Sequence, residues 1–181
     1  MRAFVAVSPP PEVREAVVER ARGLRYEGEV RWLPPENVHL TLKFLGEVPE
    51  DALAAVSAAL DGACGEHGPF GVELPDFGAF PSRERAKAVW AAVGAGSGEL
   101  GALAADIEGA LEGLGFPREK RPYLPHATVG RARGRPARLP EAEATGEPLG
   151  FRVRSVELVR SRLLPSGAVY SVLSSSPLGD A

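Results

Sequence analysis

With 181 residues, 44% hydrophobic content and a formal net charge of −3, the chain is long enough for one substantial core, or for two small lobes that share one. Its first residues are too short for the apolar part of a signal peptide, and no apolar run approaches the roughly 20 residues of a membrane span, so we expect a cytoplasmic protein. The single cysteine, Cys64, excludes an internal disulfide and a cysteine-rich zinc site, and we expect it to fill space on a helix.

The first half of the chain alternates predicted strands with predicted helices. In chain order these are a strand at 2–7, a helix at 9–24, strands at 30–32 and 38–46, and a helix at 49–64. Prolines in the first turn favour the start of the first helix, and Pro49 with two acidic residues favours the start of the second. The apolar residues at helical spacing, which we expect to face the core, are Val13, Val17 and Leu24, then Leu53, Val56, Leu60 and Cys64.

The second half continues the same alternation. Its predicted elements are strands at 70–80 and 86–93, a helix N-capped by Ser97, a strand at 126–131, an exposed irregular loop at 132–149, and strands at 151–163 and 168–173 around the turn Pro165-Ser166-Gly167. The apolar stripe of the helix, which stops at Gly115, consists of Leu100, Leu103, Ile107, Leu111 and Leu114. Strands that neighbour one another in sequence, separated by single helices, predict an α+β fold with largely antiparallel sheets and helices packed outside.

One internal repeat links the two halves. The segment PPENVHLTLKF at 34–44 is echoed by RPYLPHATVGR at 121–131, and each copy contains His-x-Thr followed by an apolar residue. Because side chains alternate along a strand, His39 and Thr41 project together, as do His126 and Thr128, while the other face of the first copy, with Leu40, Leu42 and Phe44, can sit on a core. The copies lie about half a chain apart, which predicts a single domain over 1–181, built from two pseudo-symmetric lobes whose sheets line a central groove.

Two imidazoles and two hydroxyls facing one groove suit phosphodiester chemistry without a metal. An unperturbed imidazole has a pKa of about 6.5, so one histidine can accept a proton while the other donates one. Contact with opposite sides of one phosphorus requires the rings to lie roughly 5–7 Å apart. The threonine hydroxyls would donate to the non-bridging phosphate oxygens, where charge concentrates in the transition state.

Other site types have weaker support in the sequence. The His-x-Thr spacing is not one of metal ligands, and the remaining histidine, His67, lies in a turn-like segment. There is no G-x-S-x-G nucleophile elbow and no phosphate-binding loop. Lys43 shares the polar face of its strand with His39, and we interpret it as a surface lysine rather than an electrostatic helper. A basic segment at 118–138 could attract phosphates, although a solvated arginine-rich loop explains its charge equally well.

At these residues the sequence resembles the 2H phosphoesterase superfamily, which is defined by paired His-x-[Thr/Ser]-x motifs, and within it the bacterial and archaeal 2′-5′ RNA ligase-like branch. Four blocks carry the resemblance in order: MRAFVAVSPPPEV, RWLPPENVHLTLKFLGEV, RPYLPHATVGRAR and LVRSRLLPSGAVYSVL. The resemblance implies a bilobal α+β fold with an open groove. It also implies hydrolysis of RNA 2′,3′-cyclic phosphate ends to 2′-phosphomonoesters, and reversible, ATP-independent 2′-5′ RNA ligation when an alcohol replaces water.

The resemblance also implies the roles of particular residues. His39 would be the general acid, His126 the general base, and Thr41 and Thr128 the phosphate-binding residues. Weaker substrate-binding candidates are Arg131, for phosphate, and Tyr123, for the base. Leu124 departs from the polar or basic residue that relatives often carry there.

We expect no metal or cofactor, RNA ends such as tRNA-like fragments or oligonucleotides as partners, no membrane and a monomer. Two alternatives stay open from the sequence alone. The same chemistry could act on a small cyclic nucleotide or a 2′-5′-linked dinucleotide, or the groove could bind nucleotides or RNA without turnover.

Overall fold

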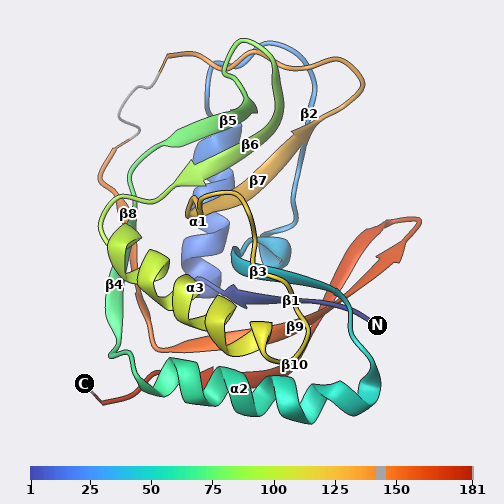
Figure 1. The fold of residues 1–181 in the computed structure, drawn as a ribbon. Coiled ribbons are helices and arrows are strands. Elements are labelled where there is room, and N and C mark those ends of the chain that lie inside the picture. Colours follow the sequence, from blue (N-terminus) through green and yellow to red (C-terminus); the bar gives the residue numbers. More distant parts are fainter. Residues whose placement is uncertain (142–145, 181) are drawn as a thin grey trace.

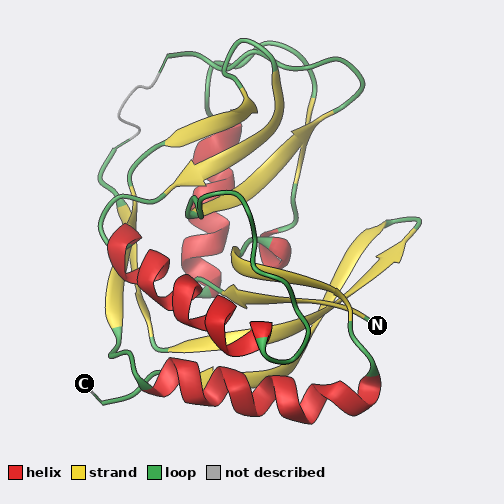
Figure 2. Ribbon diagram, viewed as in Figure 1, coloured by secondary structure: helices red, strands yellow, loops and turns green. Residues whose placement is uncertain are grey.

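The computed structural model describes residues 1–141 and 146–180, and its fold is α+β with helices packed outside antiparallel sheets (Figures 1 and 2). Its helices are α1 (Pro11–Arg22), α2 (Leu53–Gly65) and α3 (Ser97–Glu112), with 3-10 turns η1 (Pro35–Asn37) and η2 (Glu50–Ala52). Its strands are β1 (Arg2–Val7), β2 (Val30–Trp32), β3 (Leu40–Glu47), β4 (Phe70–Leu74), β5 (Phe77–Pro81), β6 (Ala86–Ala92), β7 (His126–Ala132), β8 (Leu149–Val153), β9 (Ser155–Leu164) and β10 (Gly167–Pro177). The predicted fold class is confirmed.

The larger sheet consists of two halves that meet at one residue pair. Its strand order is β10-β9-β1-β3-β7-β6-β5, with β2 paired to β7, while β4 and β8 form a separate two-stranded sheet. Within the described residues, β3 and β7 pair only through Leu40 and Ala127. In Figures 1 and 2, α1 covers the half that holds β5, β6 and β7, whereas α2 and α3 lie along the half that holds β1, β3, β9 and β10. The β9–β10 hairpin projects from this second half.

Two of the predicted strands are wrong because each is divided between the two sheets. The run at 70–80 breaks into β4 and β5, since Pro75 has no N–H to donate and cannot continue a sheet ladder. The run at 151–163 breaks at Arg154, whose carbonyl accepts a hydrogen bond from the amide of Leu178 (2.9 Å) instead of joining a ladder. In both cases the small β4–β8 sheet takes one piece and the large sheet the other.

The start and the end of α3 also differ from the prediction. Gly96 is the N-cap, with a φ of 91°, and a Cβ there would lie 2.5 Å from the carbonyl oxygen of Gly71. Ser97 is instead the first helical residue, and its hydroxyl donates to the carbonyls of Val93 and Gly94. The helix ends at Glu112, so Leu114 lies beyond the stripe and is exposed.

The apolar stripes predicted for the helices otherwise face the core. The stripe residues that are buried are Val13, Val17, Val56, Leu60, Cys64, Leu100, Leu103, Ile107 and Leu111. Leu24 and Leu53 are only partly buried against the same core. Cys64 fills space on α2 as predicted, and its burial raises the pKa of the thiol to about 11. No helix in the described part of the chain is both long and apolar enough to cross a membrane.

The segment 132–149 is not wholly an exposed loop. Ala137 and Leu139 are buried, and Ala137 forms an antiparallel bridge with Ala86 at the start of β6. The guanidinium of Arg83 donates to the carbonyl of Pro140 at 2.7 Å, which ties this segment to the turn before β6. Residues 142–145 of the predicted loop lie outside the described residues.

Candidate active site

Both motif strands carry a β-bulge at the same place after the histidine. The register of β1 with β3 skips Leu42, and the register of β6 with β7 skips Val129. Each skipped residue is the third after its histidine, so the bulge is repeated along with the motif. A bulge inserts one residue into a strand and reverses the alternation of side chains beyond it. Residues that follow the bulge therefore change faces relative to His-x-Thr.

The bulge overturns two predictions about the first motif strand. Lys43 is only 6% exposed, and its ammonium donates to Glu108 Oε2 at 2.7 Å and to the carbonyl of Pro117 at 2.8 Å, so it is not a surface lysine. Phe44, expected on the core side, is 76% exposed and has its ring centroid 6.2 Å from that of Phe4. An aromatic ring thus takes the place on the histidine-bearing face that the lysine was expected to occupy.

The junction of the two lobes brings the two motifs together on one face. Leu40 and Ala127 pair across the junction and are fully buried, so their sequence neighbours project from the opposite face. Extending this antiparallel register by one residue puts His39 opposite Thr128 and Thr41 opposite His126. The two histidines then form a diagonal pair, for which β-carbon separations of about 7–8 Å or somewhat less are usual. Two imidazoles that extend from β-carbons at this separation can reach one phosphate between them.

Each imidazole is held by the same local hydrogen bond. His39 Nδ1 lies 2.8 Å from the carbonyl oxygen of Asn37, and His126 Nδ1 lies 2.7 Å from that of Leu124. Because a carbonyl can only accept, Nδ1 must carry the proton in both rings. The neutral tautomer therefore leaves Nε2 as the acceptor, and Nε2 becomes a donor when the ring is protonated. Both rings present the same reactive nitrogen.

Aromatic side chains pack against both imidazole rings. His39 stacks on Phe4 with centroids 4.6 Å apart, and the edge of Tyr170 approaches it at 5.2 Å. His126 meets Trp90 in a T-shaped contact at 5.9 Å. Trp90 in turn lies flat over Gly78, where a Cβ would come within 2.4 Å of the indole. These aromatic contacts restrict ring rotation, and sequence patterns did not predict them because the partners lie on β1, β10 and β6.

Burial and charge both act on His39. Desolvation of its ring lowers the pKa of His39 from the ordinary value of 6.5, the bond to Asn37 opposes this shift, and the charge of His126 lowers it further. The contribution of His126 is consistent with two neighbouring imidazoles that repel one another when both are protonated. A charge on His126 therefore disfavours protonation of His39.

The structure places the two weaker site candidates, Arg131 and Tyr123, in different surroundings. Arg131 follows the second bulge, occupies the position equivalent to Phe44, and is exposed on the face that bears His126 and Thr128. Tyr123 packs against the core, and its hydroxyl is buried with no hydrogen-bond partner among the described residues. Burial raises the pKa of Tyr123 well above its usual range. The structure thus brings Arg131 to the motif face and turns the hydroxyl of Tyr123 away from solvent.

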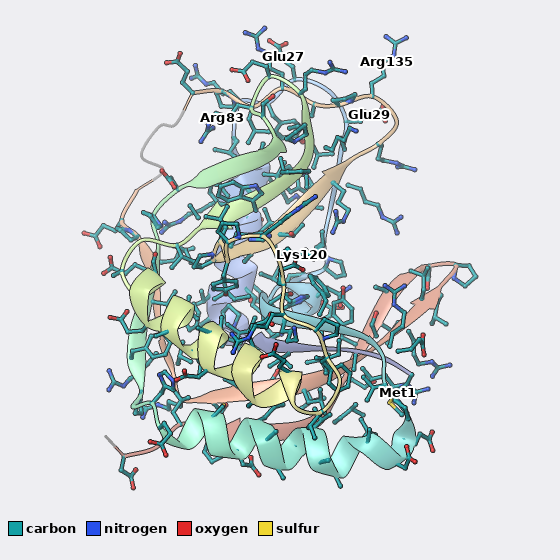
Figure 3. All side chains as sticks on the ribbon, in the orientation of Figure 1. Met1, Glu27, Glu29, Arg83, Lys120 and Arg135 are labelled. Carbon is teal, nitrogen blue, oxygen red and sulfur yellow. The ribbon has the colours of Figure 1, made fainter. Side chains whose placement is uncertain are left out.

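The basic segment 118–138 does not form one patch around the histidines. Arg118 pairs with Glu112 on the surface, at 2.7 Å. Figure 3 shows Arg135 at the outer end of the half that holds β5, β6 and β7, together with Glu27 and Glu29, whereas the exposed Lys120 projects over the middle of the view. Charge is therefore spread along the segment, and Arg131 is the member whose register places it on the motif face.

Other groups do not form a competing site. Among the described residues there is no cluster of three or more histidine, cysteine or acidic side chains that could hold a metal ion. His67 Nε2 lies 2.6 Å from Asp106 Oδ2, away from both motifs in the sequence. A depression of about 520 Å³ is lined by residues of α1, β2, the following turn and Ser166, and neither motif histidine lines it.

One family model covers most of the chain. The model of the 2′-5′ RNA ligase superfamily matches residues 9–163, a span that includes both His-x-Thr copies. The chain belongs to this superfamily. A superfamily relative from Archaeoglobus fulgidus, named RNA 2′,3′-cyclic phosphodiesterase, is 35% identical over 96% of this chain and 98% of its own length. A relative of the same name from Thermus thermophilus is 36% identical over 96% of this chain and 88% of its own.

Solved structures extend the same likeness to the fold. The crystal structure of the Thermus thermophilus protein TT0787 covers all of both chains with a TM-score of 0.85 and 33% identity. Escherichia coli LigT complexed with 3′-AMP covers 98% of this chain and 97% of its own, with a TM-score of 0.77 and 26% identity. The fold of this superfamily member is therefore shared with solved proteins over nearly its whole length.

Proposed function

We propose that this chain hydrolyses RNA 2′,3′-cyclic phosphate ends to 2′-phosphomonoesters, with the two imidazoles as general acid and base and without a metal ion. The observation that carries the proposal is the pair of histidines at the lobe junction, each with Nδ1 bound to a backbone carbonyl and Nε2 left for proton transfer. Relatives named RNA 2′,3′-cyclic phosphodiesterase, which align over most of the chain, support the substrate class.

The reaction needs one proton accepted and one donated on opposite sides of the phosphorus. His126 Nε2 takes a proton from water, whose oxygen forms the new bond to phosphorus. The bond from phosphorus to the 3′ oxygen breaks, and His39 Nε2 gives its proton to that oxygen. Thr41 and Thr128 donate hydrogen bonds to the non-bridging oxygens. If the 5′-hydroxyl of a second RNA replaces water, the same exchange joins the strands by a 2′-5′ linkage without ATP.

An acid role for His39 requires its pKa to change on binding. Burial lowers the pKa of the free ring and so disfavours its protonated form, whereas a bound anionic phosphate stabilises that form. We expect an NMR titration of the His39 ring to show a higher pKa with saturating inorganic phosphate than without it. Replacement of His126 by alanine should also raise the pKa of His39, because it removes a like charge. A pKa that falls on phosphate binding would contradict the acid role.

The test of the function is an RNA oligonucleotide that ends in a 2′,3′-cyclic phosphate. We expect hydrolysis that is unchanged by EDTA, and a product whose phosphate remains on the 2′ oxygen, identified by chromatography against both isomers. A 3′-phosphate would reverse the role given to His39. Binding without turnover would instead favour the alternative of a nucleotide- or RNA-binding module.

A small cyclic nucleotide is the second candidate substrate, and the dispersed basic charge favours it. Arg135 lies at the outer end of one lobe and Arg118 is paired with Glu112, so these two cations of the segment 118–138 do not serve a long RNA backbone at the motifs. Binding of a long RNA should weaken steeply with added salt because phosphate contacts release counterions, whereas binding of a mononucleotide should change little. A comparison of KM at two salt concentrations separates the two substrates.

A further inference from the structure

We propose that Lys43 is a positioning residue for His126. It lies on the strand that carries the first motif, and it clamps the chain segment that leads into the strand of the second motif. This inference rests on the proposed function for its effect on rate, but the clamp itself is testable without turnover. The segment concerned, here called the connector, comprises residues 113–125 between α3 and β7. In Figure 1 the connector leaves the end of α3, crosses in front of β3 and reaches the start of β7.

The clamp consists of one buried ion pair that holds two points of the connector backbone. Lys43 Nζ donates to Glu108 Oε2 and to the carbonyl oxygen of Pro117, at 2.7 and 2.8 Å. The same oxygen of Glu108 accepts the backbone N–H of Glu119 at 3.2 Å. The side chain of Lys43 is 4% exposed and that of Glu108 is 15% exposed, so solvent screens their attraction weakly. Strand β3 and helix α3 are thereby joined to the connector at one place.

The remaining polar contacts of the connector beyond Pro117 are local or lie at the surface. In the part of the chain that the structure describes, Glu119 bonds to the amides of Lys120 and Arg121, and Arg118 bonds to Glu112. His126 bonds back to the connector itself, through the carbonyl of Leu124. The position of that carbonyl sets the tilt of the imidazole. A shift of the connector would therefore move the ring that the proposed reaction uses as its base.

Comparison of the two motif strands shows that only the first carries a lysine for such a clamp. Lys43 and Gly130 follow the equivalent bulges of the two motif strands, and both positions point toward the core. Gly130 has no side chain, and the space above it is filled by Trp32 and Val30. The second motif strand thus carries no equivalent of the ammonium. The ion pair makes the geometry of His126 depend on the strand of His39, and not the reverse.

The test compares Lys43→Met with Lys43→Arg, Glu108→Gln and a control, Leu103→Ala. Leu103 is a fully buried residue of α3, and its truncation destabilises the same layer without touching the clamp. Hydrogen exchange at connector amides and the NMR signals of both imidazoles are measured first, because neither requires activity. Hydrolysis of an RNA 2′,3′-cyclic phosphate end is then measured as kcat and KM.

A clamp predicts a specific set of results. In Lys43→Met, hydrogen exchange speeds up at the amides of residues 119–121, 123 and 124. The His126 ring signals shift while those of His39 stay unchanged. The value of kcat falls about 10- to 100-fold, with KM within about threefold of the parent, as expected for a displaced catalytic group. Lys43→Arg, which keeps the charge, recovers part of kcat, and the control leaves exchange in the connector unchanged. If Lys43→Met does not fold, Glu108→Gln carries the same test.

Non-additivity supplies the second measurement. If Lys43 and Glu108 act as one clamp, the double variant Lys43→Met with Glu108→Gln loses no more kcat than the worse single variant. The proposal is overturned if connector exchange and the His126 signals match the parent in Lys43→Met. It is also overturned if the losses of the single variants multiply. Absence of hydrolysis in the parent would instead refute the proposed function and leave the exchange and NMR results to decide the clamp.

Discussion

Replacement of either motif histidine by alanine is expected to lower hydrolysis of a 2′,3′-cyclic phosphate end on the order of 10²–10⁴-fold, the usual contribution of general acid or base catalysis. In the proposed reaction, His39→Ala removes the proton donor for the departing oxygen, and His126→Ala removes the acceptor for the water proton. In each parent ring, Nδ1 is held by a backbone carbonyl and Nε2 is left for proton transfer. Alanine removes the whole ring, so no nitrogen of that side chain remains to take the place of Nε2. The loss should appear mainly in kcat, measured with substrate at saturation.

The control for this experiment is His67→Ala, which removes the third histidine and its contact with Asp106. It should retain activity close to that of the parent. The double variant that lacks both motif histidines should lose little more than the worse single variant, because the two rings act in one concerted proton exchange. Equal rates for the parent and both single variants would mean that the paired imidazoles do not perform the chemistry.

Sequence patterns grouped the residues of each motif, but they misplaced the residues directly after the first motif. Period-two alternation correctly grouped His39 with Thr41 and His126 with Thr128, and the repeat predicted that they would meet. The same alternation then misplaced Lys43 and Phe44, because a bulge at Leu42 leaves no mark in a run that alternates perfectly. The signal was present in the other copy, since a glycine inside a strand, Gly130, often marks a bulge. Transferring that bulge through the repeat would have turned Lys43 toward the core.

The surroundings of the histidines could not be predicted from local patterns. Phe4 and Tyr170, which contact His39, come from strands near opposite ends of the chain, and Trp90 reaches His126 from β6. Their contacts follow from strand order and register, which only the folded sheet defines. The same holds for the division of 70–80 and of 151–163 between two sheets, because hydrophobic periodicity identifies a strand and says nothing of which sheet it joins.

The second large effect is expected at the threonines, through replacement of Thr41 or Thr128 by valine. Valine keeps the branched shape and removes the hydroxyl, so in the proposed reaction either variant loses one hydrogen bond to a non-bridging oxygen while the strand stays intact. Loss of one such donor to a charge that grows in the transition state should lower kcat/KM on the order of 10²-fold. Ser174→Ala is the matched control, because its hydroxyl contacts Ser57 of α2 rather than either motif.

Affinity for the product phosphate distinguishes the role of the two hydroxyls from simple anchoring. If the hydroxyls serve the transition state, their removal should weaken binding of a 2′-phosphomonoester, measured by calorimetry, far less than it lowers kcat/KM. An equal loss in both quantities would mean that the threonines bind ground state and transition state alike. If the register of Leu40 with Ala127 is extended by one residue, Thr41 lies opposite His126 and Thr128 opposite His39, so each hydroxyl would work beside the imidazole of the other motif. A variant in either motif should therefore disturb proton transfer at the histidine of its partner, and an effect confined to its own motif would contradict this arrangement.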